Sequence, residues 1–418
     1  MSRLNFNLIK KIRNIFFPFY RNSDLKFVFK RLQKDTNQPK VAMFVGGCVR
    51  KYLNNEDIDD IDIATSLTPE EIKEKFKDTK FNVIDSGIKH GTVTLVYNKL
   101  KLELTTLRKD IKTDGRHAEV EYTDDWQKDS ERRDFTINAI YLTIKGKIFD
   151  PQSGVLDLKN KNLKFIGDPQ RRIEEDYLRI IRLIRFALEY QNEIEQKTFE
   201  VIKLNLNGIK KISKERILNE LFKILRTKNF VKLNDYKNLK DIFSLIFPEF
   251  RYLERLAKLN LINRNQSFSN ELLLAVLLID DTNNHEYFSH KYNVSNELRE
   301  SLNLLAKNYK IIKEKKFFFK KDLKKNIYFF GKKHLRLLNM LTFSVSKKMK
   351  INEYLNNLSN INGINLPIFS YDGNFLKKNG LKEGTIIGRT LKIIESEWIK
   401  NNFNLSNKRV LEIINQQK

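Results

Sequence analysis

Three acidic residues in the first quarter of the chain have types and spacing that suit a metal ion. Asp60 and Asp62 lie two positions apart in IDDIDIAT, residues 58–65, a stretch that alternates as a β-strand does. Successive strand side chains leave opposite faces, so we expect these two carboxylates to share a face. Two neighbouring carboxylates repel each other unless a cation lies between them. Their oxygens suit Mg²⁺, which also binds substrate phosphates.

A third acid lies in a second expected strand. Glu103 stands between Leu102 and Leu104 in LELTTLR, so the alternation directs it away from the leucine face. If this strand lies beside the strand of Asp60 and Asp62, the three carboxylates converge. Two-metal phosphoryl transfer is the chemistry that such a cluster indicates.

A glycine turn precedes the acids. FVGGCVR, residues 44–50, reads as a buried strand, a double glycine and the start of a helix. Such a turn lets backbone N–H groups meet a phosphate, with Arg50 close enough to pair with it. The alternative, that Gly46 and Gly47 only serve a tight turn, stays open. The order of strand, Gly-Gly, helix, paired aspartates and strand acid is typical of the nucleotidyltransferase superfamily that includes DNA polymerase β.

Composition limits the class of protein. The 418 residues exceed what one hydrophobic core usually holds, so several domains are expected. A formal charge of +26 indicates a polyanionic partner such as nucleic acid, although biased base composition also produces such lysine-rich sequences. The single cysteine excludes an internal disulfide and fits a reducing compartment, and we expect a cytoplasmic protein. No apolar run approaches the ~20 residues that span a membrane.

The elements expected around these motifs give an α+β fold. Residues 25–150 read as a head with a small mixed sheet and helices, and the rest reads as helical. We expect an all-α neck at 151–225, a helical body at 226–350 and a helical tail at 351–418. Residues 1–24 form a basic, aromatic extension that could be an organellar transit peptide or a docking helix. We favour the docking helix.

The motifs together resemble the class II tRNA nucleotidyltransferases, or CCA-adding enzymes, of the tRNA nucleotidyltransferase/poly(A) polymerase family. The resemblance covers residues 41–225 in order and spacing, and more loosely the tail. It is carried by FVGGCVR, DIDIAT, IKHGTVTLV, LELTTLRKDIKTDGRHAEVEYTDDWQKDSERRDFTINAI, DPQSGVLDL, RRIEEDYLRIIRLIRF and ISKERILNELFKIL.

The resemblance implies a role for each matching residue. Asp60 and Asp62 correspond to the metal-binding acids, with Glu103 as the supporting third. Gly46, Gly47 and Arg50 correspond to the triphosphate site. Arg132, Arg133 and Asp134 match the RRD motif, with Asn138 four residues on, which recognises ribose and phosphate; Arg133 and Asp134 help to select a ribonucleotide. KTDGRHAEVEYTDDWQ, which contains Gly115, corresponds to a mobile loop used in the final A addition, or is an ordinary surface loop.

Asp176 and Arg179 correspond to the residues that select the base. Residues 171–187, RRIEEDYLRIIRLIRFA, read as one helix on which these two side chains lie at i and i+3, one turn apart. Cytosine and adenine share an edge with an amine donor beside a ring-nitrogen acceptor, and a carboxylate beside a guanidinium complements it. Uracil and guanine present the reverse edge and would leave buried donors unpaired. Arg182 and Arg185 then lie near the nucleotide. The alternative is a simple i,i+3 salt bridge.

The implied activity is template-independent addition of CCA to tRNA 3′ ends from CTP and ATP, with two Mg²⁺ ions and release of pyrophosphate. The helical half, with KKDLKK at 320–325 and GKKHLR at 331–336, would contact tRNA phosphates. Three rivals remain: a poly(A) polymerase, a partial enzyme that adds only CC or only A, and a non-catalytic RNA-binding protein. Membrane association and a nucleic-acid template are not expected.

Overall fold

The computed structural model describes residues 16–36, 40–87, 91–113, 118–192, 194–262, 267–314 and 318–417. The chain divides into two compact units, Met1–Phe250 and Arg251–Lys418. The first holds the residues of the expected head and neck and the second holds most of those of the body and tail; the four-part division stays a prediction. Within the described ranges, every helix is too short or too polar to cross a membrane.

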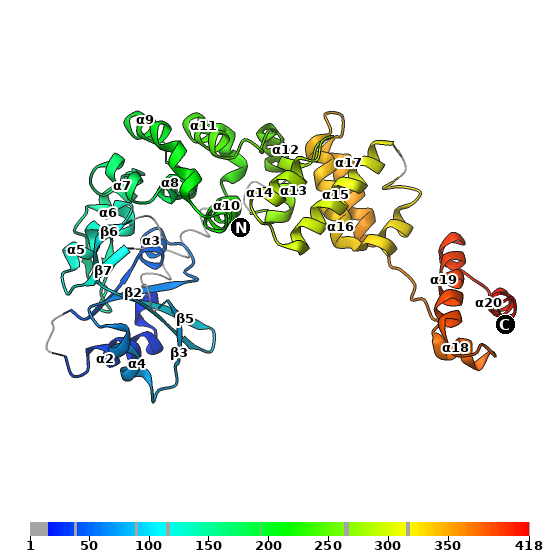
Figure 1. The fold of residues 1–418 in the computed structure, drawn as a ribbon, viewed down its shortest axis with the longest axis horizontal. Coiled ribbons are helices and arrows are strands. Elements are labelled where there is room, and N and C mark those ends of the chain that lie inside the picture. Colours follow the sequence, from blue (N-terminus) through cyan, green and yellow to red (C-terminus); the bar gives the residue numbers. More distant parts are fainter. Residues whose placement is uncertain are drawn as a thin grey trace. The chain divides into compact units, whose positions relative to one another are not determined.

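The first unit contains a seven-stranded mixed sheet in the order β3-β4-β5-β2-β1-β8-β9 (Figure 1). Only the pairing of β2 with β5 is parallel, and the other neighbours are antiparallel. The expected small mixed sheet is therefore confirmed. Its strands are β1 (Ala42–Val45), β2 (Ile61–Thr65), β3 (Asn82–Gly87), β4 (Thr92–Tyr97), β5 (Leu100–Thr106), β8 (Tyr141–Leu142) and β9 (Ile148–Phe149).

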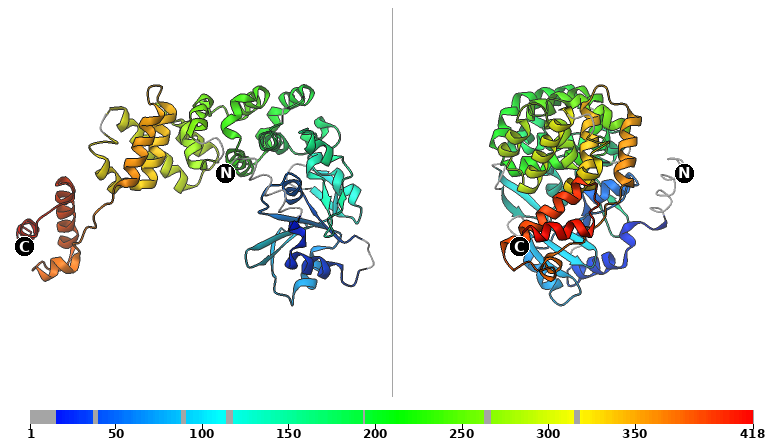
Figure 2. Two further views of the ribbon diagram at one scale, coloured as in Figure 1. Left: turned by 180° about the vertical axis from the view of Figure 1, so that it is seen from behind. Right: turned by 90° about the vertical axis from the view of Figure 1, so that its right-hand side faces the viewer.

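Helices cover the two faces of this sheet differently. Phe44 of β1 packs against Phe29 of α2 (Ser23–Gln33), with ring centroids 4.6 Å apart. Its neighbours on β1, Met43 and Val45, join a core with Trp126 of α5 (Trp126–Glu131) on the other face. Figures 1 and 2 show α2 beside α4 (Pro69–Phe76), in the blue part of the ribbon. Asp62 and Glu103 lie on this second face, since Val45 pairs with Asp62 and Asp62 pairs with Glu103.

A separate two-stranded sheet pairs β6 (Arg108–Thr113) with β7 (Ala118–Tyr122). The stretch expected as a mobile loop, residues 112–127, thus contains a strand and the start of α5. Gly115 lies outside the described residues, so its predicted role there is untested.

The remainder of the first unit is helical, as expected. After α3 (Gly47–Leu53) in the head come α6 (Gly154–Lys159), α7 (Pro169–Glu175), α8 (Leu178–Tyr190), α9 (Gln196–Asn205), α10 (Lys214–Arg226) and α11 (Lys237–Ile246), with short 3₁₀ turns η1 (Phe19–Arg21), η3 (Thr136–Asn138), η4 (Leu206–Lys211) and η5 (Phe230–Asp235). Helices α8 and α10 pack against each other along strongly amphipathic faces.

The second unit is built around α13, whose seven residues from Leu272 to Leu278 are all buried and apolar. It packs against α14, α15 and α16. A smaller core joins the last three helices, with Leu376, Ile394 and Val410 at its centre. The elements are η6 (Leu253–Arg255), α12 (Leu256–Ile262), α13 (Asn270–Leu278), α14 (Asn284–Lys291), α15 (Asn296–Glu314), α16 (Leu323–Val345, broken at Gly331), α17 (Ile351–Gly363), α18 (Gly373–Lys378), α19 (Thr385–Lys400) and α20 (Asn407–Asn415).

Candidate active site

The register of the sheet places Asp62 directly beside Glu103. In the parallel pair β2–β5, Asp62 stands opposite Glu103, and in the antiparallel pair β1–β2 it stands opposite Val45. Paired strand residues send their side chains to the same face, so the two carboxylates share the face of Val45. The condition left open by the sequence, that the strand of Glu103 lies beside that of Asp62, is met. Asp60, by contrast, precedes β2 and is exposed, because the strand begins only at Ile61.

The glycine turn lies against Asp62. Gly46 has a φ of +73°, in the left-handed region that favours glycine, and a Cβ added there would lie 3.5 Å from Asp62 Oδ2. The turn from β1 into α3 therefore brings backbone close to this carboxylate. Gly47 begins α3, and a Cβ there would meet nothing within 4 Å.

Like charges surround Asp62. Burial raises the pKa of its carboxyl above the ordinary value, and the carboxylate of Glu103 raises it further, as does Asp60; Arg133 and Arg50 act in the opposite direction. Glu103 Oε1 accepts a hydrogen bond from Lys101 Nζ at 2.7 Å. A cation at this position would relieve the repulsion between Asp62 and Glu103, which is the electrostatic condition that a divalent metal site requires.

The three acids do not converge as a group. Within the described residues, no three Asp, Glu, His or Cys side chains lie close enough together to hold a metal ion. The structure does not show the three acids gathered as a metal site, because Asp60 lies before β2 and outside the strand whose alternation was used to place it, and their metal role stays a prediction. Mg²⁺ often takes only one or two protein carboxylates and completes its shell with water and substrate phosphate, so the residues present still fit such an ion.

The RRD segment is organised by a buried acid that the sequence analysis missed. Asp129 of α5 is 0% exposed. Its Oδ1 accepts from Arg132 Nε and Nη2 at 2.8 and 2.6 Å, and its Oδ2 accepts from Arg133 Nη2 at 2.9 Å and from the Tyr141 hydroxyl at 2.7 Å. The two guanidinium groups hold the pKa of Asp129 well below its usual range although burial alone would raise it. A single carboxylate thus fixes both arginines.

A second network joins the RRD segment to the neck. Asp134 Oδ1 accepts from Asn138 Nδ2 at 2.6 Å, and its Oδ2 accepts from Arg182 Nε at 2.7 Å, which lies on α8. Arg50 donates to Asn138 Oδ1, and its Nε donates to the Tyr190 hydroxyl at 3.0 Å. The structure therefore brings Arg50, Asn138, Asp134 and Arg182 together. Arg50 of α3 is buried, and its guanidinium lies 4.9 Å from the centre of the Phe186 ring of α8; its expected role at a phosphate stays a prediction.

The neck run is not one helix, and this corrects the sequence interpretation. Helix α7 ends at Glu175, Asp176 is extended with φ −155° and ψ 103°, and α8 begins at Leu178. The break is stabilised by Asp176 itself, whose Oδ1 accepts from the backbone N–H of Leu178 at 3.1 Å. Short acidic side chains compete for backbone donors in this way. Nearby, Gly208 leaves room for the ring of Tyr177, since a Cβ there would lie 2.0 Å from it.

Asp176 and Arg179 consequently have different partners. Asp176 Oδ2 accepts from Arg216 Nη2 of α10 at 2.7 Å. Arg179 Nη1 donates to Glu175 Oε2 and to the carbonyl of Arg172, both at 2.7 Å. Among the described residues, Asp176 and Arg179 form no salt bridge with each other, so the alternative of an i,i+3 salt bridge is wrong.

Arg185 lies with this group but faces α10. Its Nε donates to the buried Glu220, and its guanidinium lies 4.0 Å from the centre of the Phe186 ring. Arg172, whose Nη2 donates to the carbonyl of Arg132 at 2.6 Å, ties α7 to the RRD segment. The sequence carried only weak signals for the partners that it missed. Asp129 stands three residues before the pair Arg132 and Arg133, and Arg172 belongs to an arc of residues 171–187 that is rich in arginines and acids.

A site of adjacent strand acids, a glycine turn and an arginine-rich neck defines a nucleotidyltransferase head joined to a helical neck. The family model "Poly A polymerase head domain" matches residues 42–164, and "Probable RNA and SrmB- binding site of polymerase A" matches residues 193–253. The "CCA-adding enzyme" of Staphylococcus haemolyticus is 33% identical over 382 residues, which cover 86% of this chain and 90% of that protein. This chain belongs to the CCA-adding enzyme family.

Other relatives match a shorter stretch. "CCA tRNA nucleotidyltransferase 1, mitochondrial" of Mus musculus is 45% identical over 205 residues, 48% of this chain and 46% of that protein, so the chain spans about half the length of this relative. The solved CCA-adding enzyme of Bacillus stearothermophilus in complex with CTP has a TM-score of 0.71 at 21% identity and covers 94% of this chain and 96% of its own. That similarity supports the fold. Because relatives include mitochondrial proteins, the expected cytoplasmic location stays a prediction.

Proposed function

We propose that this protein adds CCA to the 3′ end of tRNA from CTP and ATP without a nucleic-acid template. The observation that carries the proposal is the pair of consecutive residues Arg133 and Asp134. Arg133 lies near enough to Asp62 to oppose the rise in the pKa of that carboxyl caused by burial and Glu103, and Asp134 accepts a hydrogen bond from Arg182 of α8, the helix that also carries Arg179. The acids that suit phosphoryl transfer and the helix proposed to select the base are thereby joined through one short segment.

The proposed reaction forms one bond and breaks one. The tRNA 3′ oxygen attacks the α-phosphorus, its proton leaves, and the bond to the β-phosphate breaks to release pyrophosphate. Asp62, Asp60 and Glu103 are the residues proposed to hold two Mg²⁺ ions. Bound there, such ions neutralise triphosphate charge and lower the pKa of the 3′ hydroxyl. Gly46, Gly47 and Arg50 are proposed to position the triphosphate, and Arg133, Asp134 and Asn138 the ribose and phosphates.

Base selection is proposed to reside in Asp176 and Arg179. A carboxylate that accepts from an exocyclic amine, beside a guanidinium that donates to a ring nitrogen, complements cytosine and adenine alike. The side chain of Asp176 is bonded to Arg216 and that of Arg179 to Glu175, so a base must join or displace these contacts. Arg182 and Arg185 are proposed to support the nucleotide from α8.

Single-nucleotide incubations test the activity. A tRNA transcript that ends at the discriminator base is incubated with labelled CTP, with ATP, or with both, beside an unrelated RNA of equal length. We expect two C residues from CTP alone, and one further A when ATP is present, on tRNA only. Long A tails on both RNAs would instead support the poly(A) polymerase named by the matching head-domain model. Incorporation of only CC or only A would indicate a partial enzyme, and no incorporation a non-catalytic RNA-binding protein.

A further inference from the structure

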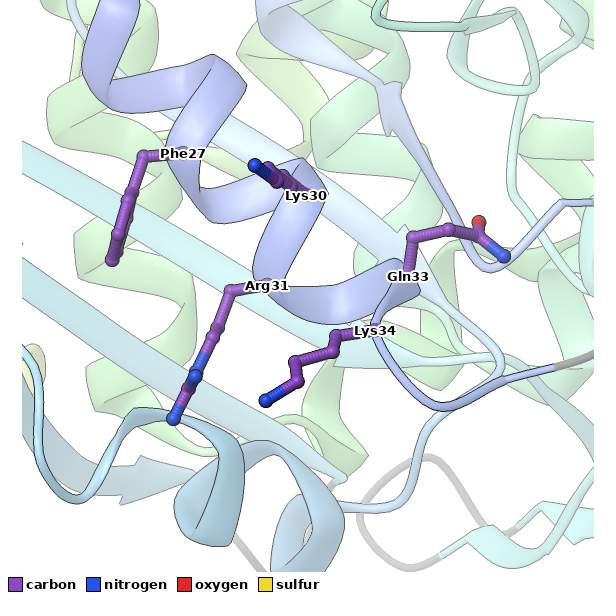
Figure 3. Close-up of a pocket in the computed structure, with 5 residues that line it drawn as sticks. All are labelled: Phe27, Lys30, Arg31, Gln33 and Lys34. Carbon is purple, nitrogen blue, oxygen red and sulfur yellow. The ribbon is translucent and has the colours of Figure 1, made fainter.

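A basic cavity of about 450 Å³ lies along α2. Figure 3 shows that the side chains of Phe27, Arg31 and Lys34 leave the same side of this helix, one turn after another. The lining residues are Phe27, Lys30, Arg31, Gln33 and Lys34, which include three cations, an amide and an aromatic ring but no carboxylate. A cavity of this size accommodates a small organic anion.

The cavity is separate from the candidate active site. Helix α2 packs on the sheet through Phe29, which contacts Phe44. Asp62 stands opposite Val45, the next residue of β1, and consecutive strand residues face opposite sides of a sheet. The cavity therefore lies on the face of the sheet that is remote from Asp62 and Glu103, and the nucleotide at the acids does not reach it.

Its cations are placed to receive an anion. Arg31 Nε donates to the backbone carbonyl of Lys75 at 2.6 Å, which fixes the guanidinium between α2 and α4. The ammonium groups of Lys30 and Lys34 have no carboxylate within ion-pair distance in the part of the chain that the structure describes. Lys34 leaves the same side of α2 as Arg31, whereas Lys30 leaves another side and lies at the rim of the cavity (Figure 3). A fixed guanidinium beside such a lysine suits a phosphate, which binds both a planar donor and a point charge.

The aromatic member favours a ligand that also carries a flat ring. Phe27 is 40% exposed, which is high for a phenyl group beside charged residues. Its ring stacks on Phe81 with centroids 6.1 Å apart and an angle of 12° between planes, and Lys80 Nζ lies 5.7 Å from its centre, so these two neighbours set the orientation of the ring. Exposed aromatic rings among cations are how proteins hold single-stranded nucleic acid, since a base stacks on the ring and the phosphates meet the cations.

We infer that this cavity binds one nucleotide of a single-stranded RNA segment, with its phosphate at Arg31, Lys34 and the rim residue Lys30 and its base on Phe27. That the bound nucleotide belongs to an RNA chain rests on the proposed function. That the cavity suits a phosphate and a flat ring rests on its lining residues alone. A free nucleotide offers the same phosphate and ring, and the experiment separates these sources.

The test measures binding of a labelled oligouridylate about ten nucleotides long to the full chain, without NTP or divalent metal, at a series of salt concentrations. Each phosphate contact contributes about 0.7 to the slope of log affinity against log salt for a single strand. We expect the double substitution Lys30→Gln with Lys34→Gln to lower that slope by about 1.4. Phe27→Ala should weaken binding by about fivefold or more while leaving the slope unchanged. Lys26→Gln, on an exposed residue of the same helix outside the cavity, is the matched control and should change neither quantity.

Two outcomes overturn the inference. One is a double variant and a Phe27→Ala variant that both behave as the Lys26→Gln control does. The other is an effect of these variants on the binding of AMP but not of the oligomer, which would assign the cavity to a free nucleotide. Because no nucleotide addition is measured, a failed catalytic assignment would leave this result intact, and a failed cavity assignment would leave the catalytic proposal intact.

Discussion

Asp62 is the residue on which the proposed chemistry depends most. It is partly buried, it faces Glu103 across a parallel pair of strands, and the glycine turn lies against it. We expect Asp62→Ala to lower nucleotide addition by about a thousandfold, a loss of several kcal/mol of transition-state stabilisation, while tRNA affinity changes less than about twofold.

Asp59 provides the matched control for this measurement. It is an acid three positions away whose side chain is 70% exposed and paired with Lys51. Asp59→Asn should leave single-turnover addition nearly unchanged. Equal rates for the Asp62 variant and the wild type would contradict the metal assignment.

Asp129 is predicted to hold the RRD segment in place. Removing its charge by Asp129→Asn leaves two guanidinium groups without their shared carboxylate, and breaking such a buried pairing costs about 3 kcal/mol or more. Urea unfolding at neutral pH measures the loss. Asp124→Asn, on an exposed neighbouring acid, should change the free energy of unfolding by less than about 0.5 kcal/mol.

The same carboxyl makes stability depend on pH. Because the folded state lowers the pKa of Asp129 below the unfolded value of about 3.9, its contribution is fully present above that value and is lost as the pH falls toward the folded pKa. The difference in unfolding free energy between wild type and Asp129→Asn should therefore be constant above about pH 5 and should shrink as the pH falls from about 5 to about 2. A difference that stays constant over this range would contradict the assignment.

At the scale of elements, the sequence predicted which segments form strands better than it predicted where a strand begins or a helix breaks. Alternation located β2, but it left open whether the strand of Glu103 lies beside β2, and the structure shows that it does. It misplaced Asp60 because nothing in a period-two pattern marks where a strand begins. It also read residues 171–187 as one helix, since the run has no glycine or proline. The break is stabilised by the local hydrogen bond from the Leu178 N–H to Asp176, and apolar periodicity does not reveal such competition for a backbone donor.

The partners of Asp176 and Asp134 could not be predicted from the sequence, because they lie far away along the chain. Arg216 lies 40 residues after Asp176, and Arg182 lies 48 after Asp134, so these pairs form only when α8, α10 and the RRD segment are packed together. Local spacing suggested that Asp176 and Arg179 would meet each other.

Asp176 lies in the break between α7 and α8, just before α8 begins. Replacing this residue tests the proposal that it selects the base. We expect Asp176→Ala to reduce the preference for CTP and ATP over UTP and GTP by about tenfold, because the acceptor for the exocyclic amine is lost. Glu174→Ala, on an exposed residue of α7, is the control. Competition between pairs of NTPs in single-turnover addition measures the preference, and an unchanged preference in the Asp176 variant would remove the template role.

At the scale of the whole molecule, the charge of +26 predicts salt-sensitive binding of tRNA. The lysines expected to contact tRNA differ in exposure and in their contacts within the protein. Lys320 and Lys321 are exposed, whereas Lys324 lies 4.9 Å from the centre of the Phe403 ring and Lys333 pairs with Glu271 at 3.6 Å. We expect Lys320→Gln with Lys321→Gln to lower the slope of log tRNA affinity against log salt by about 1.8, and Lys324→Gln to have a smaller effect. Equal slopes for all three proteins would exclude this segment from the tRNA contact.

The most direct test of the account is to sequence the 3′ ends of a tRNA lacking CCA after incubation with the full chain and equal concentrations of all four NTPs. Protein side chains are proposed to choose the base, so the wild type should add C, C and A in that order and then stop. Tails of A residues of varied length, or frequent incorporation of U and G, would contradict it.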